Sequence, residues 1–311
     1  MNAIEVSRLT RRFGTFVAVD DLSFDVRQGE IFGFLGSNGA GKSTTIRMLC
    51  GLLRPSSGAA RVGGIDVGSN PEGVKPRIGY MSQRFSLYEK LTVDQNIAFF
   101  GGIYGLDAGR LAARRAAVLD MAGLRGREAT LTGALSGGWR QRLGLGCAIL
   151  HEPPIIFLDE PTSGVDPLSR RRFWRLIDEL AARGTTVLVT THYLDEAEHC
   201  HRIAIINGGR LAALGTVAEL KQVFAGRPIL DVRAAQPVEA MRRLEKMHEV
   251  EKTSIFGTAV HAVLRSSEAS PDASPDAIAA RLVAAGIDAR CTVVDPTLED
   301  VFLDIAERSS R

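Results

Sequence analysis

A glycine-rich run that ends in a lysine and two hydroxyl side chains is the first part of the sequence whose residue types suggest chemistry. Residues 36–43 read GSNGAGKS and fit the pattern G-x-x-x-x-G-K-[ST] of a phosphate-binding loop. Glycines let backbone N–H groups turn toward phosphate oxygens, while the Lys42 ammonium can reach terminal phosphates and the Ser43 hydroxyl can bind Mg²⁺. The predicted phosphate-binding residues are Gly36, Ser37, Asn38, Gly39, Ala40, Gly41, Lys42, Ser43 and Thr44.

Two adjacent carboxylates follow a second apolar run, IIFLDE, at residues 155–160. A carboxylate at the end of a buried parallel strand lies near a phosphate loop that follows a neighbouring strand. We therefore expect Asp159 to hold Mg²⁺ through water, and Glu160 to orient or deprotonate an attacking water. The alternative is a pair of solvated acids that closes a strand. The four large apolar residues before them and the phosphate loop in the same chain make that interpretation the weaker one.

A histidine and a glutamine depend on their context for their interpretation. His192 ends the apolar run TTVLVTTH, where it could contact a γ-phosphate and respond to its loss. Taken alone, such a histidine is more often a core residue with satisfied hydrogen bonds. Gln83, in YMSQ, is equally uninformative by itself. Both residues gain a role only if further motifs accompany them.

The elements that must position these residues alternate along the chain. The runs EIFGFLG, PIIFLDEP and TTVLVTTH are continuously apolar, as buried strands are, and helical patterns separate them. This alternation predicts an α/β domain with a mostly parallel sheet and helices on its faces. Residues 84–150 are mainly helical in pattern. We expect them to form an inserted helical subdomain within a first domain of residues 1–220.

Residues 221–311 have a different pattern and are predicted to form a second, accessory domain. Segments there read as strand, helix, strand, strand, helix and strand, which is the order of a small ferredoxin-like α+β domain. A final helix, TLEDVFLDIAERS, follows. Its apolar residues recur at helical spacing, so we expect one face to be buried against another surface. That face consists of Leu298, Val301, Phe302 and Ile305.

The composition excludes several classes of protein. The chain has 311 residues, a formal net charge of +2 and 45% hydrophobic residues, which are ordinary values for a globular protein. No run approaches roughly 18 apolar residues, so we expect no membrane span. The N-terminal residues have no apolar signal core, so we expect no export by the usual route. Four scattered cysteines suit a reducing compartment, and the near-zero charge argues against nucleic acid as a partner.

Five motifs occur along the chain in a characteristic order. They are the phosphate loop, SQ, LSGG, FLDEPTSGVD and the histidine that ends a strand. In this order, over about residues 3–220, the sequence resembles the nucleotide-binding subunits of ABC transporters. The resemblance implies a P-loop NTPase fold of the ABC cassette type, with antiparallel edge strands beside a mostly parallel core sheet. It also implies that the chain binds and hydrolyses ATP with Mg²⁺.

The resemblance assigns roles to matching residues. Phe13 matches the aromatic side chain that stacks on adenine, and His192 matches the switch histidine. Gln83 matches the glutamine that senses Mg²⁺ and couples to the membrane partner, while residues 163–166 match the loop that touches the opposite subunit. The implied catalytic residues are Lys42, Gln83, Glu160 and His192. The implied Mg²⁺ ligands are Ser43, Gln83 and Asp159.

The LSGG stretch resembles a second phosphate-binding turn, without a lysine. In the family it binds the γ-phosphate of ATP held by the other subunit, so Ser136, Gly137 and Gly138 are expected to serve a second polypeptide's nucleotide. Lysine is unnecessary there because the first subunit supplies Lys42. The family often has glutamine after the second glycine, whereas this sequence has Trp139. Any polar contact that a glutamine would make at that position is therefore lost.

The stretch YMSQRFSLYEKLTVDQNI and the C-terminal VDPTLEDVFL narrow the resemblance to ATPase subunits of ABC-2 type exporters, a drug and small-molecule efflux group. This subgroup implies a separate transmembrane permease, a second ATPase subunit that is a copy or a paralogue, and a peripheral location on the cytoplasmic face of the inner membrane. The helical subdomain would hold a cytoplasmic helix of the permease. Phe85, Leu87 and Tyr88 would line its groove, or else simply pack in the core.

Two other functions remain open at this stage. A soluble ABC ATPase that acts on ribosomes or DNA is one, although ribosomal members usually carry two cassettes and this chain has one phosphate loop. DNA-repair members carry a long coiled coil, and no long heptad run occurs here. In the other, the C-terminal domain is a ligand-sensing regulator of the same ATPase.

Overall fold

The computed structural model of the chain describes residues 1–83, 87–265 and 274–308. The chain divides into two compact units, Met1–Val217 and Ala218–Arg311, and each is described by itself. The division falls within the short helix α8 (Val217–Lys221), three residues before the end of the first domain expected from the sequence. In the described part of the chain, no helix combines the length and the apolar character that crossing a membrane requires.

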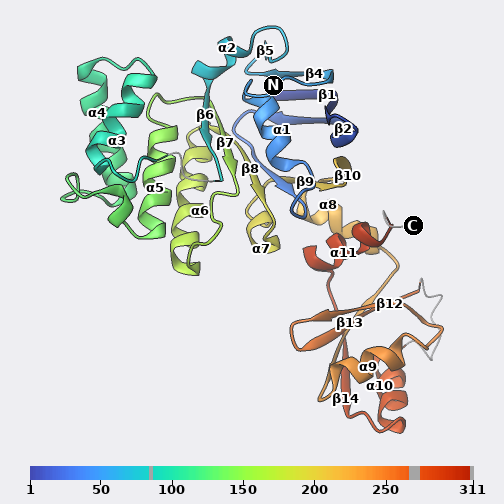
Figure 1. The fold of residues 1–311 in the computed structure, drawn as a ribbon. Coiled ribbons are helices and arrows are strands. Elements are labelled where there is room, and N and C mark those ends of the chain that lie inside the picture. The colour runs from blue at the N-terminus through green and yellow to red at the C-terminus, as the bar shows by residue number, and fades with distance from the viewer. Residues whose placement is uncertain (84–86, 266–273, 309–311) are drawn as a thin grey trace. The chain divides into compact units, whose positions relative to one another are not determined.

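The central sheet of the first unit has six strands in the order β10-β9-β3-β8-β7-β6. All neighbours pair in parallel except β10, which is antiparallel to β9 (Figure 1). Every residue of β3, β7 and β8 is buried, which explains their continuous apolar runs. The strands are β3 (Ile31–Leu35), β6 (Ile78–Met81), β7 (Ile155–Asp159), β8 (Thr186–Thr191), β9 (Arg202–Asn207) and β10 (Arg210–Gly215).

A second, antiparallel sheet has the order β2-β1-β4-β5 and encloses the main core together with the first sheet. Helix α1 (Lys42–Leu49) adds its apolar side chains to this core, and the rings of Phe24 and Phe32 stack there at 5.5 Å. The strands are β1 (Asn2–Phe13), β2 (Phe16–Arg27), β4 (Ser57–Val62) and β5 (Ile65–Asp66). The predicted α/β class is confirmed, with antiparallel strands at the edge.

The helical layer consists mainly of three helices that pack on one another around a core of their own (Figure 1). Thr92 and Gln95 form a reciprocal cap at the start of α3, and Asp107 caps α4. The helices of this layer are α3 (Val93–Ile103), α4 (Ala108–Ala122), η2 (Thr132–Ala134) and α5 (Gly137–Ala148). The other helices of this unit are α2 (Pro71–Val74), η1 (Lys75–Arg77), α6 (Pro167–Ala182) and α7 (Leu194–Ala197).

The second unit is a four-stranded antiparallel sheet in the order β12-β13-β11-β14, with α9 and α10 packed against it. Its elements follow the order expected from the sequence, while its likeness to ferredoxin-like domains stays a prediction. They are η3 (Gln222–Phe224), β11 (Ile229–Ala234), α9 (Pro237–Leu244), β12 (Val250–Phe256), β13 (Ala259–Leu264), α10 (Pro275–Ala284), β14 (Ala289–Val294) and α11 (Leu298–Arg308).

The final helix α11 differs in part from the expectation. Leu298 and Val301 are buried, but Phe302 and Ile305 are only half-buried. Two acids of the same helix are buried and paired with residues of other elements: Asp300 lies 2.8 Å from Nδ1 of His261, and Asp304 accepts hydrogen bonds from Arg227 and Lys252. Burial acts to raise the pKa of Asp304, but these hydrogen bonds outweigh it and lower that pKa. The spacing of apolar residues could not predict these buried acid contacts, because the partners of the acids lie on β12, β13 and the segment before β11.

Candidate active site

The glycine-rich loop joins the end of β3 to the start of α1, and Lys42 closes it. The Lys42 ammonium donates to the carbonyl oxygens of Gly36 at 2.8 Å and Ser37 at 3.1 Å. Gly41 has φ +100°, and a Cβ there would lie 2.4 Å from the carbonyl oxygen of Ala18, so no other residue fits. The loop is therefore wrapped around the N-terminus of α1, where backbone N–H groups and the helix dipole favour an anion.

The other predicted members of the loop lie around this turn. Residues 37–39 are exposed, Ser43 and Thr44 are half-buried, and Ala40 is buried with its carbonyl oxygen bonded to the N–H of Gly209. The loop is thus anchored to the central sheet at its base and open at its tip.

Asp159, the last residue of β7, is tied to the loop through Ser43. Its Oδ1 accepts hydrogen bonds from the Ser43 hydroxyl at 2.9 Å and the Thr190 hydroxyl at 2.8 Å. Burial and the neighbouring charge of Glu160 raise the pKa of Asp159, although the two hydroxyl donors oppose that shift. Hydroxyl and carboxylate oxygens are the ligands that Mg²⁺ prefers, so this pair fits a magnesium site at the mouth of the loop.

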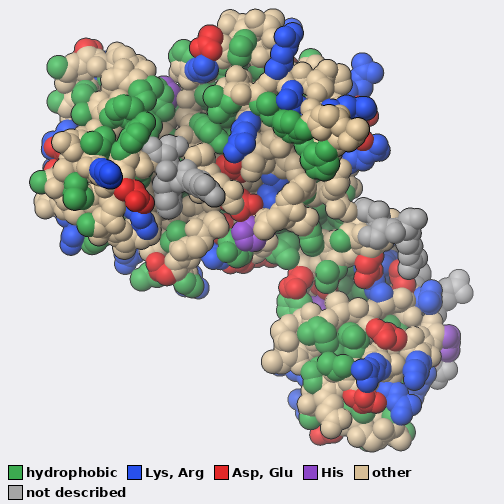
Figure 2. Space-filling model, viewed as in Figure 1, with side chains coloured by type: hydrophobic (Ala, Val, Ile, Leu, Met, Phe, Trp, Pro, Cys, Tyr) green, Lys and Arg blue, Asp and Glu red, His purple; other side chains and the backbone are tan. Residues whose placement is uncertain are grey.

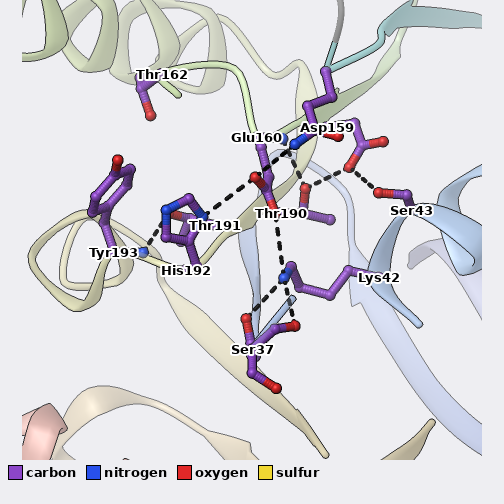
Figure 3. A network of polar contacts seen from close by, with 12 residues as sticks. Ser37, Lys42, Ser43, Asp159, Glu160, Thr162, Thr190, Thr191, His192 and Tyr193 are labelled. Carbon is purple, nitrogen blue, oxygen red and sulfur yellow. Dashed lines mark hydrogen bonds and ion pairs between the residues drawn. The ribbon is translucent and has the colours of Figure 1, made fainter. Parts of the chain in front are cut away.

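Glu160 is the centre of the cluster (Figure 3). One carboxylate oxygen lies 3.3 Å from Nζ of Lys42, while the other accepts from Nε2 of Gln83 at 3.1 Å and lies 3.3 Å from Nδ1 of His192. The backbone of Glu160 has φ +46°, a left-handed conformation that costs energy for a residue with a Cβ, and its N–H donates to the Thr190 hydroxyl at 2.8 Å. This turn of the backbone points the carboxylate at Lys42.

The LSGG turn leads directly into helix α5. The side chains of this turn and of the first part of the helix differ in exposure and in the elements they contact. Ser136 is exposed and makes no side-chain capping bond to the helix. Trp139 is half-buried against the helical layer, with the guanidinium of Arg127 4.1 Å from its ring centre. Gln141, one turn into the helix, is buried and donates to the carbonyl oxygen of Pro161, directly after Glu160. The tryptophan therefore supports the helical layer, and Gln141 links the turn to the loop that follows β7.

The structure brings together six of the predicted residues: Lys42, Ser43, Gln83, Asp159, Glu160 and His192. Phe13 lies apart at the tip of the β1–β2 hairpin, 46% exposed, with the Arg11 guanidinium 4.5 Å from its ring centre. Residues 136–138 also lie outside this cluster. Sequence reasoning missed the Thr190 hydroxyl, which bridges Asp159 and Glu160; the two threonines before His192 were its only signal.

Comparisons with known proteins agree with this geometry. The family model described as ABC transporter matches residues 19–163, and a model described as AAA domain, putative AbiEii toxin, matches residues 134–194. The daunorubicin/doxorubicin resistance ATP-binding protein DrrA of Streptomyces peucetius is 41% identical over 281 residues, which cover 90% of this chain and 81% of that protein. The chain belongs to the ABC transporter ATP-binding proteins.

One further relative and one solved structure show how much of this chain resembles known ABC proteins. A probable multidrug ABC transporter ATP-binding protein of Escherichia coli, YbhF, is 50% identical over 218 residues, or 70% of this chain. Those residues span only 38% of YbhF. A solved structure of an ATP binding subunit of an ABC transporter aligns with a TM-score of 0.66 and 32% identity, over 72% of this chain and 93% of that one. The fold of the first unit is therefore that of an ABC cassette.

Trp139→Gln is expected to keep ATP turnover close to that of the wild type. Its ring packs on Arg127 and the helical layer, so its loss should lower the free energy of unfolding by about 1–2 kcal/mol and leave the phosphate contacts intact. Steady-state ATPase assays and thermal unfolding would measure the two effects. Lys42→Ala is the reference for a broken site, and an equal loss of turnover in Trp139→Gln would contradict this prediction.

Proposed function

We propose that the cassette is the Mg²⁺-dependent ATPase subunit of an ABC exporter and that it powers a separate transmembrane permease. The observation that supports this most strongly is the cluster around Glu160, where a buried lysine, a glutamine and a histidine converge on one carboxylate. Such an arrangement suits phosphoryl transfer to water, in which positioning and charge stabilisation supply most of the catalysis.

In this proposal each residue of the cluster has one task. The loop N–H groups and Lys42 bind the β- and γ-phosphates, and Phe13 stacks on the adenine. Bound Mg²⁺ would neutralise charge between the phosphates, held by oxygens of Ser43, Gln83 and Asp159. Glu160 orients the attacking water and accepts its proton. His192, whose Nδ1 lies beside a carboxylate oxygen of Glu160, contacts the γ-phosphate.

A second ATPase subunit would complete each nucleotide site. The Ser136 hydroxyl is exposed and not used to cap α5, so it is free to meet the γ-phosphate of ATP bound to another polypeptide. Gly137 and Gly138 would offer backbone N–H groups at the same helix N-terminus. ATP would then join two subunits, which are two copies of this chain or this chain and a paralogue.

The permease would dock on a groove beside the helical layer. A cavity of about 490 Å³ lies between the end of α1, strand β6, the end of α3 and the start of α4. Leu52 and Ile103, both in its lining, are 56% and 60% exposed, and hydrophobic side chains gather on the face of the helical layer that carries α3 (Figure 2). An apolar cytoplasmic helix of an ABC-2 type permease fits this groove. The cassette would then lie on the cytoplasmic face of the inner membrane.

Leu87 and Tyr88, which the sequence suggested for a permease groove, are not among the residues that line this cavity, and they divide between core and surface. Tyr88 is 49% exposed with its ring 4.7 Å from that of Phe99, whereas Leu87 is buried in the core of the helical layer. Phe85 lies outside the described residues. We include Tyr88 in the docking surface and assign Leu87 to packing.

Ile103→Glu tests this docking. A charge in an apolar contact loses its hydration without gaining a partner, so the variant should bind its candidate permease at least about 100-fold more weakly. ATP binding by the isolated cassette should not change. Co-purification from membranes that contain the candidate ABC-2 type permease would measure the effect, with Val283→Glu, which is 54% exposed on α10, as the matched control. Equal recovery of the two variants would count against this groove as the permease docking site.

ATP turnover that is stimulated by ribosomes or DNA would favour the alternative function, a soluble ABC ATPase that does not take part in transport.

The names of two relatives point to the cargo. DrrA is named for resistance to daunorubicin and doxorubicin, and YbhF for multidrug transport. We propose that the exported substrate of this system is likewise a drug-like small molecule, selected by the permease.

A further inference from the structure

We infer that Glu196 is a positioning residue for ATP hydrolysis, because it joins the loop that carries Glu160 to the loop that carries His192. This inference rests on the proposed ATPase function and adds a residue that the family motifs quoted above do not include. Glu196 lies on the short helix α7 and is 1% exposed. A buried carboxylate is costly unless it is paired and hydrogen-bonded, so its contacts indicate its task.

The two carboxylate oxygens of Glu196 bind one loop each. Oε1 accepts a hydrogen bond from the hydroxyl of Thr162, two residues after Glu160. Oε2 accepts from the hydroxyl of Thr191 at 2.7 Å, and Thr191 directly precedes His192. Both threonines are 1% exposed. One carboxylate therefore sets the spacing of two loops whose catalytic side chains lie 3.3 Å apart.

A second set of contacts connects Glu196 to His192 through Tyr193 and Arg170. The Thr191 hydroxyl also accepts from the N–H of Tyr193 at 2.9 Å, and the Tyr193 ring lies 4.1 Å from the ring of His192. Arg170 on α6 pairs with Glu196 at 3.2 Å and places its guanidinium 4.2 Å from the Tyr193 ring centre. The backbone before His192 and the ring beside it are thus both tied to Glu196.

Replacement by glutamine separates positioning from packing. Glutamine has nearly the same volume, but its side chain has one acceptor oxygen and a donor –NH₂ group. It can accept from only one of the two threonine hydroxyls through that oxygen, and it no longer neutralises Arg170. Glu196→Gln should therefore loosen one loop relative to the other without opening a cavity.

The expected result is a split between the kinetic constants. Small displacements of a reacting group cost large factors in rate, so Glu196→Gln should lower kcat on the order of 10–100-fold. KM for ATP and the affinity for ATP should stay within about threefold, because the phosphate loop and Phe13 make no contact through Glu196. A residue that only stabilised the fold would lower the unfolding temperature and leave kcat per folded molecule unchanged.

Thr162 offers a matched pair of variants for the same test. Thr162→Val removes the hydroxyl at nearly constant volume, while Thr162→Ser keeps it. We expect Thr162→Val to lower kcat and Thr162→Ser to restore most of it, in the full chain at saturating Mg-ATP. If Glu196→Gln fails to fold, this pair decides alone. Wild-type kcat in the valine variant, or equal losses in the valine and serine variants, would overturn the inference.

The failure of this inference differs from the failure of the proposed function. If the wild-type chain binds Mg-ATP and hydrolyses it while the variants match it, only the role of Glu196 is wrong. If the wild-type chain turns over no ATP with or without its permease, the proposed function fails and the role of Glu196 fails with it. A parallel loss of ATP affinity and kcat in Glu196→Gln would also overturn the inference, because it would place the defect in nucleotide binding.

Discussion

Glu160→Gln is expected to lower ATP turnover on the order of 10²–10⁴-fold and to leave ATP binding intact. Glutamine keeps the shape of the side chain but cannot accept a proton from water. Glu160 also lies 3.3 Å from the buried Lys42 ammonium, which a γ-phosphate would need. Glutamine removes that competing charge, so the affinity for ATP should equal or exceed that of the wild type.

This variant should accumulate as an ATP-bound dimer, because the phosphate contacts that join two subunits persist while hydrolysis is blocked. Size-exclusion chromatography with Mg-ATP, together with turnover assays, would measure both effects. Glu179→Gln, which removes an exposed carboxylate of α6, is the control and should behave as the wild type. Loss of ATP binding in Glu160→Gln, or turnover within about tenfold of the wild type, would exclude Glu160 as the base.

A mixture of two inactive variants should regain ATP turnover if each nucleotide site is shared between subunits. Lys42→Ala would weaken the hold on the phosphates, and Ser136→Arg would block the turn that we propose serves the partner's nucleotide. When the two variants pair, one site combines both defects. The other combines the intact phosphate loop of one subunit with the intact LSGG turn of the other, so it can work.

The measurement is ATP turnover of each variant alone and of the mixture, with ATP-driven dimer formation followed in parallel. Each variant alone should fall on the order of 10²–10³-fold below the wild type. Pairing of the mixture should return at least in part even if one intact site does not suffice for turnover. If neither pairing nor turnover returned, each site would lie within one chain, and the shared-site assignment of Ser136 would be withdrawn.

The local sequence determined the phosphate loop and the buried strands on which the candidate site is built. A glycine-rich loop between an apolar run and a helical pattern can hardly adopt another structure, because Gly41 occupies a conformation that other residues avoid. The runs that became β3, β7 and β8 are buried on both faces, so their apolar composition alone indicated parallel strands. Parallel strands end at one edge of a sheet, and this placed Asp159, Glu160 and His192 near the loop. The order of the motifs identified the family.

Only the tertiary structure decided how these side chains meet. Ser43 and Asp159 are 116 residues apart in sequence, and Gln83 and Glu160 are 77 apart, so no local pattern could specify their hydrogen bonds. The left-handed backbone of Glu160 is likewise imposed by its surroundings, because local preference opposes it.

The same limit applies to the buried acids. Glu196 and Asp304 are charged residues within helical patterns, where the sequence suggests a solvated surface. Each is buried because hydroxyl or cationic partners from other elements satisfy its carboxylate. Burial of a charge depends on partners brought together by the fold, whereas burial of an apolar run is a property of the run itself.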